Sequence, residues 1–245
     1  MKDVYNTADL FETGLKELEE KHLTRILSPL EKKSGKLVDL EKRELLDFAS
    51  NDYLNLANNP EVVDAASKAL KILGASSSAS RLVTGTSHKH VELEQGLAHW
   101  TRREEALIFG TGYQTNTGTI QALVGRHDSI FIDKYAHASL VDGSLLSRAN
   151  IFRFKHNDMA HLKKLLETQS KKRRAAEKFI VITESIFSMD GDSPDFNDLV
   201  ALSAKYESLL LVDEAHSFGI TGDCGSGSMS AIDKHKDLTL SLIHI

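Results

Sequence analysis

Short apolar runs separated by helix-forming segments fill the second half of the chain. The runs lie at 106–109, 129–133, 151–154, 179–183 and 209–212, and the predicted helices at 114–124, 139–148, 158–174 and 196–206. Unbroken apolar runs are typical of strands buried on both faces of a sheet. Their alternation with helices predicts right-handed βαβ crossovers and a mostly parallel central sheet in a three-layer α/β/α domain.

The first hundred residues have a different pattern. Their predicted elements are a helix over 8–27, a hairpin formed by 36–40 and 45–49, and helices over 60–73 and 87–100. Pro29 should end the first helix, and Asn59 should cap the helix that begins at Pro60. Between the last two helices, 74–86 holds small hydroxyl residues around Arg81. This composition fits an anion-binding loop, but it favours a flexible linker.

Polar residues follow the predicted strands at the point where each strand ends. Asp213 and His216 lie three residues apart just after one strand, and His137 follows another. Ligands of open α/β sheets collect at the carboxyl edge. A buried carboxylate there can keep a pyridine nitrogen protonated, while His216 reaches a phenolic oxygen of the same ring and His137 stacks on its face. A lone histidine is more often structural, but the three positions converge on one edge.

A turn of the sequence Gly-Thr-Gly-Tyr lies at 110–113, between a predicted strand and a predicted helix. Glycines let the backbone approach a phosphate, and the start of a helix offers free N–H groups. No Gly-Lys-Ser/Thr follows, so this turn is not a P-loop. The missing lysine loop also weighs against interpreting Val-Asp-Glu-Ala-His (212–216) as the acidic metal-binding box of a helicase-like ATPase.

The composition is that of an ordinary globular protein, with 41% hydrophobic and 27% charged residues. A net charge of −5 gives no reason to expect a nucleic-acid partner. A single cysteine, Cys224, excludes internal disulfides and fits a reducing compartment. The amino terminus does not resemble a secretory signal, and no run approaches the roughly 18 apolar residues of a membrane helix. We therefore expect a soluble, cytoplasmic protein with no membrane partner.

Several motifs in order resemble the α-oxoamine synthases, acyltransferases that use pyridoxal 5′-phosphate (PLP) and have the fold-type-I architecture of aminotransferases. The motifs are Ser-Asn-Asp-Tyr-Leu (50–54), Ser-Arg-Leu-Val-Thr-Gly-Thr (80–86) with His90 and Leu-Glu (93–94), Thr-Gly-Tyr (111–113), Ala-His-Ala-Ser (136–139), His-Asn-Asp (156–158), Glu184 with Phe-Ser-Met-Asp-Gly-Asp (187–192), and Val-Asp-Glu-Ala-His (212–216) with Gly219 and Gly222. The resemblance runs from about Phe48 to about Leu238. Each motif alone would be weak, but together they are specific.

The resemblance implies a role for individual residues. Those that match cofactor contacts are Gly112 and Tyr113 for the phosphate, His137 for the ring face, Ser188 for the ring, His216 for its phenolic oxygen and Asp213 for its nitrogen. Of these, His137, Asp213 and His216 are the expected catalytic residues. The expected substrate contacts are Arg25, Asn51, His137 and Glu184, with Arg25 lying in the loosest motif. No metal is expected.

The resemblance also implies an activity. These enzymes condense an amino acid with an acyl-CoA or acyl-carrier-protein thioester, with loss of carbon dioxide and release of the thiol. The motifs at 154–158 and 188–192 are most similar to the branch that joins L-alanine to a pimeloyl thioester in biotin synthesis; a glycine C-acetyltransferase-like activity is the alternative. The family forms homodimers with the active sites at the interface, and 76–86 would then serve the neighbouring subunit.

The chain departs from the family after the predicted strand that begins at Asp237. No lysine follows Leu240 where the family has its Schiff-base lysine, and the carboxyl-terminal small domain is absent; Lys234 and Lys236 precede the strand. The expected organisation is an amino-terminal helix and arm over 1–55 and an incomplete PLP-binding domain over 56–245. We therefore expect negligible activity from these residues alone. A non-catalytic partner of a heteromeric synthase is the other hypothesis.

Overall fold

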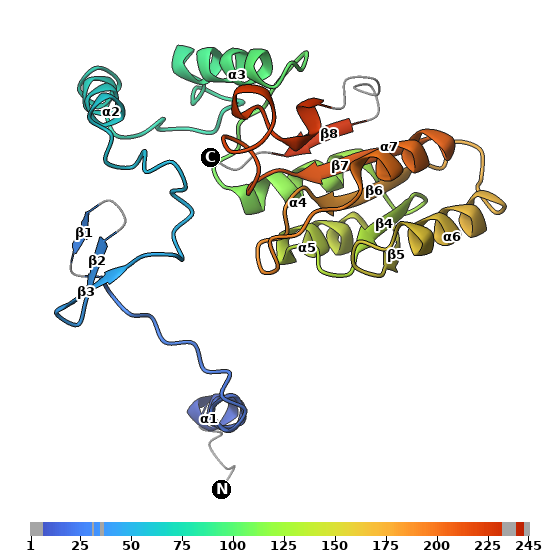
Figure 1. The fold of residues 1–245 in the computed structure, drawn as a ribbon, viewed down its shortest axis with the longest axis horizontal. Coiled ribbons are helices and arrows are strands. Elements are labelled where there is room, and N and C mark those ends of the chain that lie inside the picture. The colour runs from blue at the N-terminus through green and yellow to red at the C-terminus, as the bar shows by residue number, and fades with distance from the viewer. Residues whose placement is uncertain (1–6, 31, 35–36, 232–238, 243–245) are drawn as a thin grey trace, which may run out of the picture. The chain divides into compact units, whose positions relative to one another are not determined.

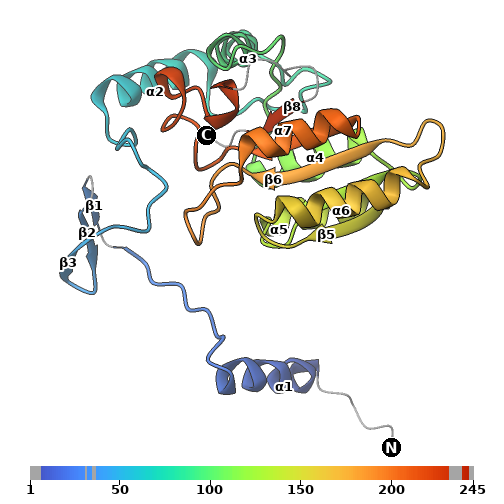
Figure 2. The ribbon, with the colours of Figure 1, turned by 45° about the vertical axis from the view of Figure 1, so that its right-hand side comes forward.

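The computed structural model describes residues 7–30, 32–34, 37–231 and 239–242. The chain divides into two compact units, Met1–Lys71 and Ile72–Ile245. The ribbon is shown in Figure 1 and, turned by 45°, in Figure 2. Among the described residues, none of the helices is long and apolar enough to cross a membrane. Lys234, Lys236 and Asp237 lie outside the described residues.

The first unit contains two helices and a small antiparallel sheet. Its elements are α1 (Thr7–Glu20), β1 (Lys32–Ser34), β2 (Leu37–Leu40), β3 (Arg43–Leu46) and most of α2 (Pro60–Leu73). β2 pairs with both β1 and β3, so the predicted hairpin is present and β1 was missed. The Asn59 side chain accepts a hydrogen bond from the N–H of Glu61 at 2.9 Å, which confirms the predicted cap of α2.

The prediction that the first helix extends to residue 27 is wrong. α1 ends at Glu20, and His22 follows with a left-handed φ of 53°. The N–H of Leu23 then donates to the carbonyl of Leu18 at 2.8 Å, the six-to-one bond that closes many helices. The chain therefore leaves the helix well before Pro29.

The second unit is built around a five-stranded parallel sheet in the order β5-β4-β6-β7-β8. Its strands are β4 (Ser129–Asp133), β5 (Asn150–Phe154), β6 (Phe179–Glu184), β7 (Ser208–Asp213) and β8 (Thr239–Leu242). Its helices are α3 (His88–Trp100), α4 (Gly112–Leu123), α5 (Ala138–Ser147), α6 (Met159–Ser170) and α7 (Phe196–Lys205), with the short 3-10 turns η1 (Asp223–Gly225) and η2 (Ser228–Ala231). The α/β fold predicted from the alternation of runs is confirmed.

Two apolar layers cover the two faces of this sheet. Phe131, Val181 and Leu210 pack with residues of α6 and α7, whereas the adjacent strand positions pack with residues of α4 and α5. The same division is visible in Figures 1 and 2. Because neighbouring strand residues point to opposite faces, an unbroken apolar run can fill both layers. The result is the predicted α/β/α arrangement.

Residues 106–109 were predicted to form a strand, and the structure corrects this. They have no regular secondary structure and pair with none of the described strands, and side chains bind their backbone instead. The N–H of Ile108 donates to Glu94 at 2.9 Å, and its carbonyl accepts a hydrogen bond from Arg81 at 3.2 Å. Side chains of α3 and of the 74–86 segment therefore replace a neighbouring strand.

The predicted helix over 158–174 is also shorter than expected, because α6 ends at Ser170. Arg173 lies beyond its end, and its guanidinium donates to the carbonyls of Glu177 and Tyr206, each at 2.9 Å. The basic residues at this point therefore bind loop carbonyls and do not continue the helix.

The contact between α4 and α5 depends on Gly143. A Cβ built at this position would lie 3.1 Å from both the Asn116 carbonyl oxygen and the Thr117 Cα. These are backbone atoms, which cannot move aside as a flexible side chain can. The glycine therefore lets α5 lie directly against the first turns of α4.

Replacing Gly143 with alanine should lower the free energy of unfolding by about 1–3 kcal/mol, because the added methyl overpacks the α4–α5 contact. Gly96 in α3 is the matched control, since a Cβ added at this position would meet nothing within 4 Å. Gly96→Ala should raise the free energy of unfolding by roughly 0.5–1 kcal/mol through helix propensity alone. Urea unfolding followed by circular dichroism measures both, and equal effects of the two substitutions would contradict this account.

Candidate active site

Three strands of the second unit end in buried acids at the carboxyl edge of the sheet. Asp133 ends β4, Glu184 ends β6 and Asp213 ends β7, and none is more than 4% exposed. Glu184 and Asp213 are direct neighbours in the register of β6 and β7. The sheet also reverses its order here, since β5 and β6 lie on opposite sides of β4. Such a switch point is where open α/β sheets bind ligands.

Asp213 accepts hydrogen bonds on both of its carboxylate oxygens. The side-chain amide of Asn116 in α4 donates to Oδ2 at 2.8 Å, and the N–H of Ala215 donates to Oδ1 at 3.0 Å. Asn116 also donates to Ser139 Oγ at 2.8 Å. Sequence reasoning missed Asn116 and used Ser139 only as part of a family motif, without a role in the site. The signal that could have found them was a polar residue within the first two turns of each helix that follows a candidate binding loop.

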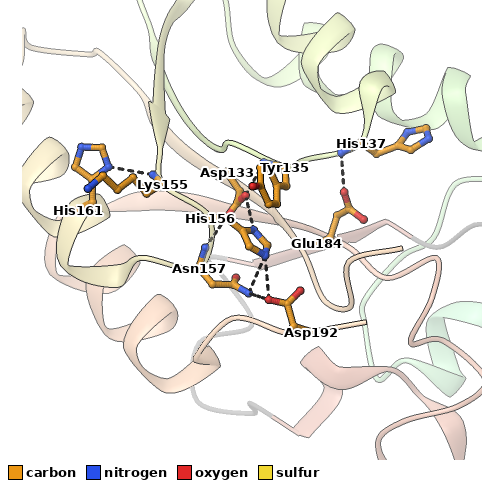
Figure 3. Close-up of polar contacts among 9 residues, drawn as sticks. All are labelled: Asp133, Tyr135, His137, Lys155, His156, Asn157, His161, Glu184 and Asp192. Atoms are coloured by element: carbon orange, nitrogen blue, oxygen red, sulfur yellow. Dashed lines mark hydrogen bonds and ion pairs between the residues drawn. The ribbon is translucent and has the colours of Figure 1, made fainter. Parts of the chain in front are cut away.

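His137 is the N-cap of α5. Its N–H donates to Glu184 Oε1 at 2.6 Å, as Figure 3 shows, and its ring Nδ1 accepts a hydrogen bond from the N–H of Ser139. The side chain is exposed at the edge of the sheet. The structure therefore brings His137 and Glu184, two predicted site residues, into direct contact.

Glu184 has a strongly altered acidity. Burial raises the pKa of Glu184 to about 7, and the negative charges of Asp213 and Asp133 add to this. The N–H of His137 and the nearby His156 oppose the shift. A carboxyl group whose pKa lies near neutrality can give or take a proton under physiological conditions. Glu184 is therefore the strongest candidate for proton transfer at this edge.

His156, in the loop that follows β5, lies between two carboxylates (Figure 3). Its Nδ1 is 3.0 Å from Asp133 Oδ1, and its Nε2 is 2.9 Å from Asp192 Oδ2. Burial lowers the pKa of His156, but the hydrogen bonds and charges of Asp133 and Asp192 raise it, and the net shift is upward. The ring also stacks on Tyr135 at 4.5 Å and meets the edge of Phe187 at 4.4 Å.

These contacts hold the loop that follows β6 against the end of β4. Asn157 reinforces them, because its N–H donates to Asp133 at 2.9 Å and its side-chain amide donates to Asp192 at 2.7 Å. Ser188, a predicted cofactor contact, is exposed in a turn of this same loop. The His-Asn-Asp motif was used only to identify the family resemblance, and the structure gives its first two residues a positioning role.

The predicted phosphate-binding turn lies at the start of α4. Gly112 is the first residue of this helix, and Thr111 caps it by accepting the N–H of Gln114 at 3.2 Å. Tyr113 is half exposed, and its hydroxyl donates to Asp142 at 3.1 Å. The hydrogen bond and negative charge of Asp142 raise the pKa of Tyr113. The helix start thus presents a rigid, capped first turn.

Three further predicted residues are His216, Arg25 and Asn51. His216 is partly buried in the turn that follows β7, three residues after Asp213. Arg25 and Asn51 are exposed and belong to the first unit, whereas the other predicted site residues belong to the second. Their expected place on the substrate side stays a prediction.

The carboxylate of Glu214, the residue after Asp213, is buried and is bound by donors from the chain itself. It is 1% exposed, and its carboxylate accepts hydrogen bonds from the N–H of Met229 at 3.0 Å and from the hydroxyls of Ser217 and Ser241. A Cβ at Gly227 would lie only 2.6 Å from Glu214 Oε1. These donors occupy the carboxylate that a metal-binding box would need, which weighs further against a helicase-like ATPase.

Arg81 is also engaged within the chain. Its guanidinium forms a two-pronged ion pair with Glu94, with Nη2 3.0 Å from Oε2, and its Nε donates to Thr86 at 3.4 Å. The segment is therefore neither a free linker nor a loop with an available arginine for an anion. Arg81 fastens the 74–86 segment to α3.

A cavity of about 730 Å³ adjoins the start of α4. It is bounded by 105–112, α3, α4 and β8, with mostly apolar lining from residues such as Leu97, Phe109 and Leu240. Gly112 lines it, but the three acids at the sheet edge do not. The cavity therefore lies beside the start of α4 but is distinct from the polar site formed by the three acids.

Residues 43–242 match the family model described as aminotransferase class I and II. The chain belongs to this family. Curated relatives named 8-amino-7-oxononanoate synthase include that of Chromobacterium violaceum, 46% identical over 215 residues that cover 88% of this chain and 55% of the relative. The relative from Geobacter sulfurreducens is 43% identical over 228 residues, 93% of this chain and 57% of the relative. The chain thus spans about half the length of the curated relatives it matches.

Solved structures share the fold. The serine palmitoyltransferase of Sphingomonas wittichii has a TM-score of 0.86 at 30% identity, covering 96% of this chain and 60% of its own. The 8-amino-7-oxononanoate synthase of Francisella tularensis has a TM-score of 0.62 at 28% identity, covering 78% and 50%. The fold class expected from the sequence motifs, and the resemblance to this group of transferases, are confirmed.

The raised pKa of Glu184 predicts a particular dependence of stability on pH. The unfolded chain loses this proton near pH 4.5, whereas the folded protein holds it up to about pH 7. The folded state therefore binds more protons in this window, and the free energy of unfolding should fall as pH rises through it. A shift of this size corresponds to roughly 3 kcal/mol. Glu184→Gln should flatten the fall, as measured by urea unfolding across the window.

Glu177→Gln is the matched control for that experiment. Burial raises the pKa of Glu177, but hydrogen bonds from Arg174 and Ser129 outweigh it and the net shift is downward. The stabilisation by its ionised form is complete above about pH 4.5 and is lost only below it, so Glu177→Gln should lower the free energy of unfolding evenly across the window and leave the pH slope unchanged. If Glu184→Gln left the pH slope as it is in the unsubstituted protein, the proposed protonation of Glu184 would be wrong.

Proposed function

We propose that this chain forms the PLP-binding part of an 8-amino-7-oxononanoate synthase. The whole enzyme would condense L-alanine with the carbonyl carbon of a pimeloyl thioester, release carbon dioxide and free the thiol, in biotin biosynthesis. The observation that carries the proposal is the buried Asp213 carboxylate at the end of β7, held by N–H donors on both oxygens. The reaction is the one that the motif resemblance implies, and relatives at 43–46% identity bear the name of this synthase.

The residues present fit the cofactor. PLP has a pyridine nitrogen that a carboxylate stabilises in its protonated form and a phosphate that suits a helix start. Asp213 offers that carboxylate, and Gly112 with Tyr113 offers the first turn of α4. A serine palmitoyltransferase from S. paucimobilis, solved with PLP and myriocin bound, has a TM-score of 0.85 and 28% identity to this chain. We therefore assign PLP as the cofactor.

When bound, PLP supplies an electron sink for the charge left at the α-carbon of the amino acid. Asp213 would hold the proton on the ring nitrogen, and His216 would hydrogen-bond the phenolic oxygen. His137 would lie against one ring face, and Ser188 would contact the ring from the loop after β6. Glu184, which keeps its proton up to about pH 7, would face the substrate side beside His137.

The proposal extends to the rest of the protein. Arg25 and Asn51 would contact the substrates, and the protein would act as a homodimer in the cytoplasm without a nucleic-acid or membrane partner. Support for these points comes from the family motifs. A homodimer would let 76–86 contribute to the neighbouring site.

Pyridoxamine 5′-phosphate tests the site without any need for a lysine, because it binds through its ring and phosphate. We expect this chain to bind it, and Asp213→Asn to weaken binding by about 10- to 100-fold through loss of a charged hydrogen bond. Asp198→Asn, an exposed carboxylate in α7, is the control and should bind normally. Isothermal titration calorimetry gives the affinities. Equal binding by both variants would remove Asp213 from the site.

The substrate assignment calls for a separate assay of the protein expressed from its native gene. Thiol release from pimeloyl-CoA with L-alanine should exceed release from acetyl-CoA with glycine by at least about tenfold, because pocket contacts along the acyl chain discriminate to this degree. A reversed preference would identify a glycine C-acetyltransferase-like enzyme. Binding of pyridoxamine 5′-phosphate without release from either pair would favour a non-catalytic partner subunit.

A further inference from the structure

A continuous row of hydrogen bonds joins His137 at the surface to Asp213 in the interior. The ring Nδ1 of His137 lies 2.7 Å from Ser139 Oγ. The side-chain amide of Asn116 bridges the next two gaps, at 2.8 Å to Ser139 Oγ and 2.8 Å to Asp213 Oδ2. Ser139 and Asn116 are both fully buried. The row crosses from α5 through α4 to the end of β7.

The chemistry of the donors fixes the direction of every bond in this row. A carboxylate only accepts hydrogen bonds, so Asp213 must face the NH₂ group of Asn116 and not its carbonyl oxygen. The second N–H of the same amide points to Ser139, whose oxygen therefore accepts. A hydroxyl oxygen can accept twice, so the last bond takes its direction from Nδ1, which accepts from the backbone N–H of Ser139 and therefore receives the hydroxyl proton as well. The N–H of Ser139 is directed at the same nitrogen, at 3.3 Å.

We propose that Asn116 and Ser139 are positioning residues that set the tautomer of His137. Two donors converge on Nδ1, so the neutral ring carries its proton on Nε2 and presents an N–H donor on its outer side. The negative charge of Asp213 sets these bond directions. It orients the amide of Asn116, and the amide in turn orients the hydroxyl of Ser139. The functions of His137 and Asp213 rest on the proposed PLP site, but the hydrogen bonds that connect them do not.

A packing role alone does not account for Asn116. Within the described part of the chain, its Oδ1 is buried and has no hydrogen-bond partner. Burying an amide with an unsatisfied oxygen costs free energy that an apolar side chain of similar size would not. The two N–H bonds that the amide makes are therefore the property that distinguishes it from leucine at this position.

Nitrogen-15 NMR of the His137 ring, in the cofactor-free chain at about pH 8 where free imidazoles are neutral, tests the proposal. The unsubstituted protein should show a protonated Nε2 and an unprotonated Nδ1. Asn116→Leu and Ser139→Ala should shift the tautomer ratio toward protonated Nδ1 by about 2- to 10-fold, the equivalent of one lost hydrogen bond. Ser203→Ala, a buried serine of α7 whose hydroxyl has no partner among the described residues, should leave the ratio unchanged.

The outcomes separate this inference from the proposed function. A proton on Nδ1 in the unsubstituted protein would overturn the inference, as would an unchanged ratio in folded Asn116→Leu. Thermal unfolding identifies a misfolded variant. If Asn116→Leu is misfolded, Ser139→Ala, which removes only the hydroxyl beside His137 Nδ1, becomes the deciding test of the inference. Titration with pyridoxamine 5′-phosphate follows. A tautomer shift without binding leaves the row intact and overturns the PLP site, whereas binding without the shift overturns the row alone.

Discussion

Buried carboxylates at one edge of a parallel sheet are the constraint on which the rest of the second unit depends. An acid removed from water is costly unless hydrogen-bond donors surround it. Asp133 obtains its donors from the loop after β5, Glu184 from the start of α5, and Asp213 from α4. Each acid therefore determines which loop or helix lies beside it. The same contacts that satisfy the acids assemble the candidate site.

Much of this arrangement could be predicted because the signals are local. The apolar runs that became β4, β6 and β7 are buried along almost their whole length, so sequence pattern and structure coincide. The polar residue at the end of each run then had to fall at the carboxyl edge. In contrast, the run at 106–109 is also apolar, but its backbone binds the side chains of Arg81 and Glu94. No local pattern distinguishes an apolar segment held by side chains from a strand.

Three residues, Asn116, Ser139 and His156, were given no role in the site from the sequence, and the physical reason is the same for each. Asn116 and Ser139 lie within helices, where polar residues usually face solvent, and only the packing of α4 against α5 buries them beside Asp213. His156 was visible in a motif, but its two partners lie 23 and 36 residues away in the sequence. Such contacts arise from the order of strands in the sheet. They become predictable only once that order is known.

Glu214 helps to fix the register of β8 against β7. Ser241 of β8 lies opposite Val212 and donates its hydroxyl to the Glu214 carboxylate. A slip of β8 by one residue would turn a leucine toward that carboxylate and reverse the faces of the whole strand. The slipped pairing would leave part of a buried charge unsatisfied directly beside Asp213. The acid next to the candidate catalytic acid thus makes a misaligned sheet unstable at the point where misalignment would do most harm.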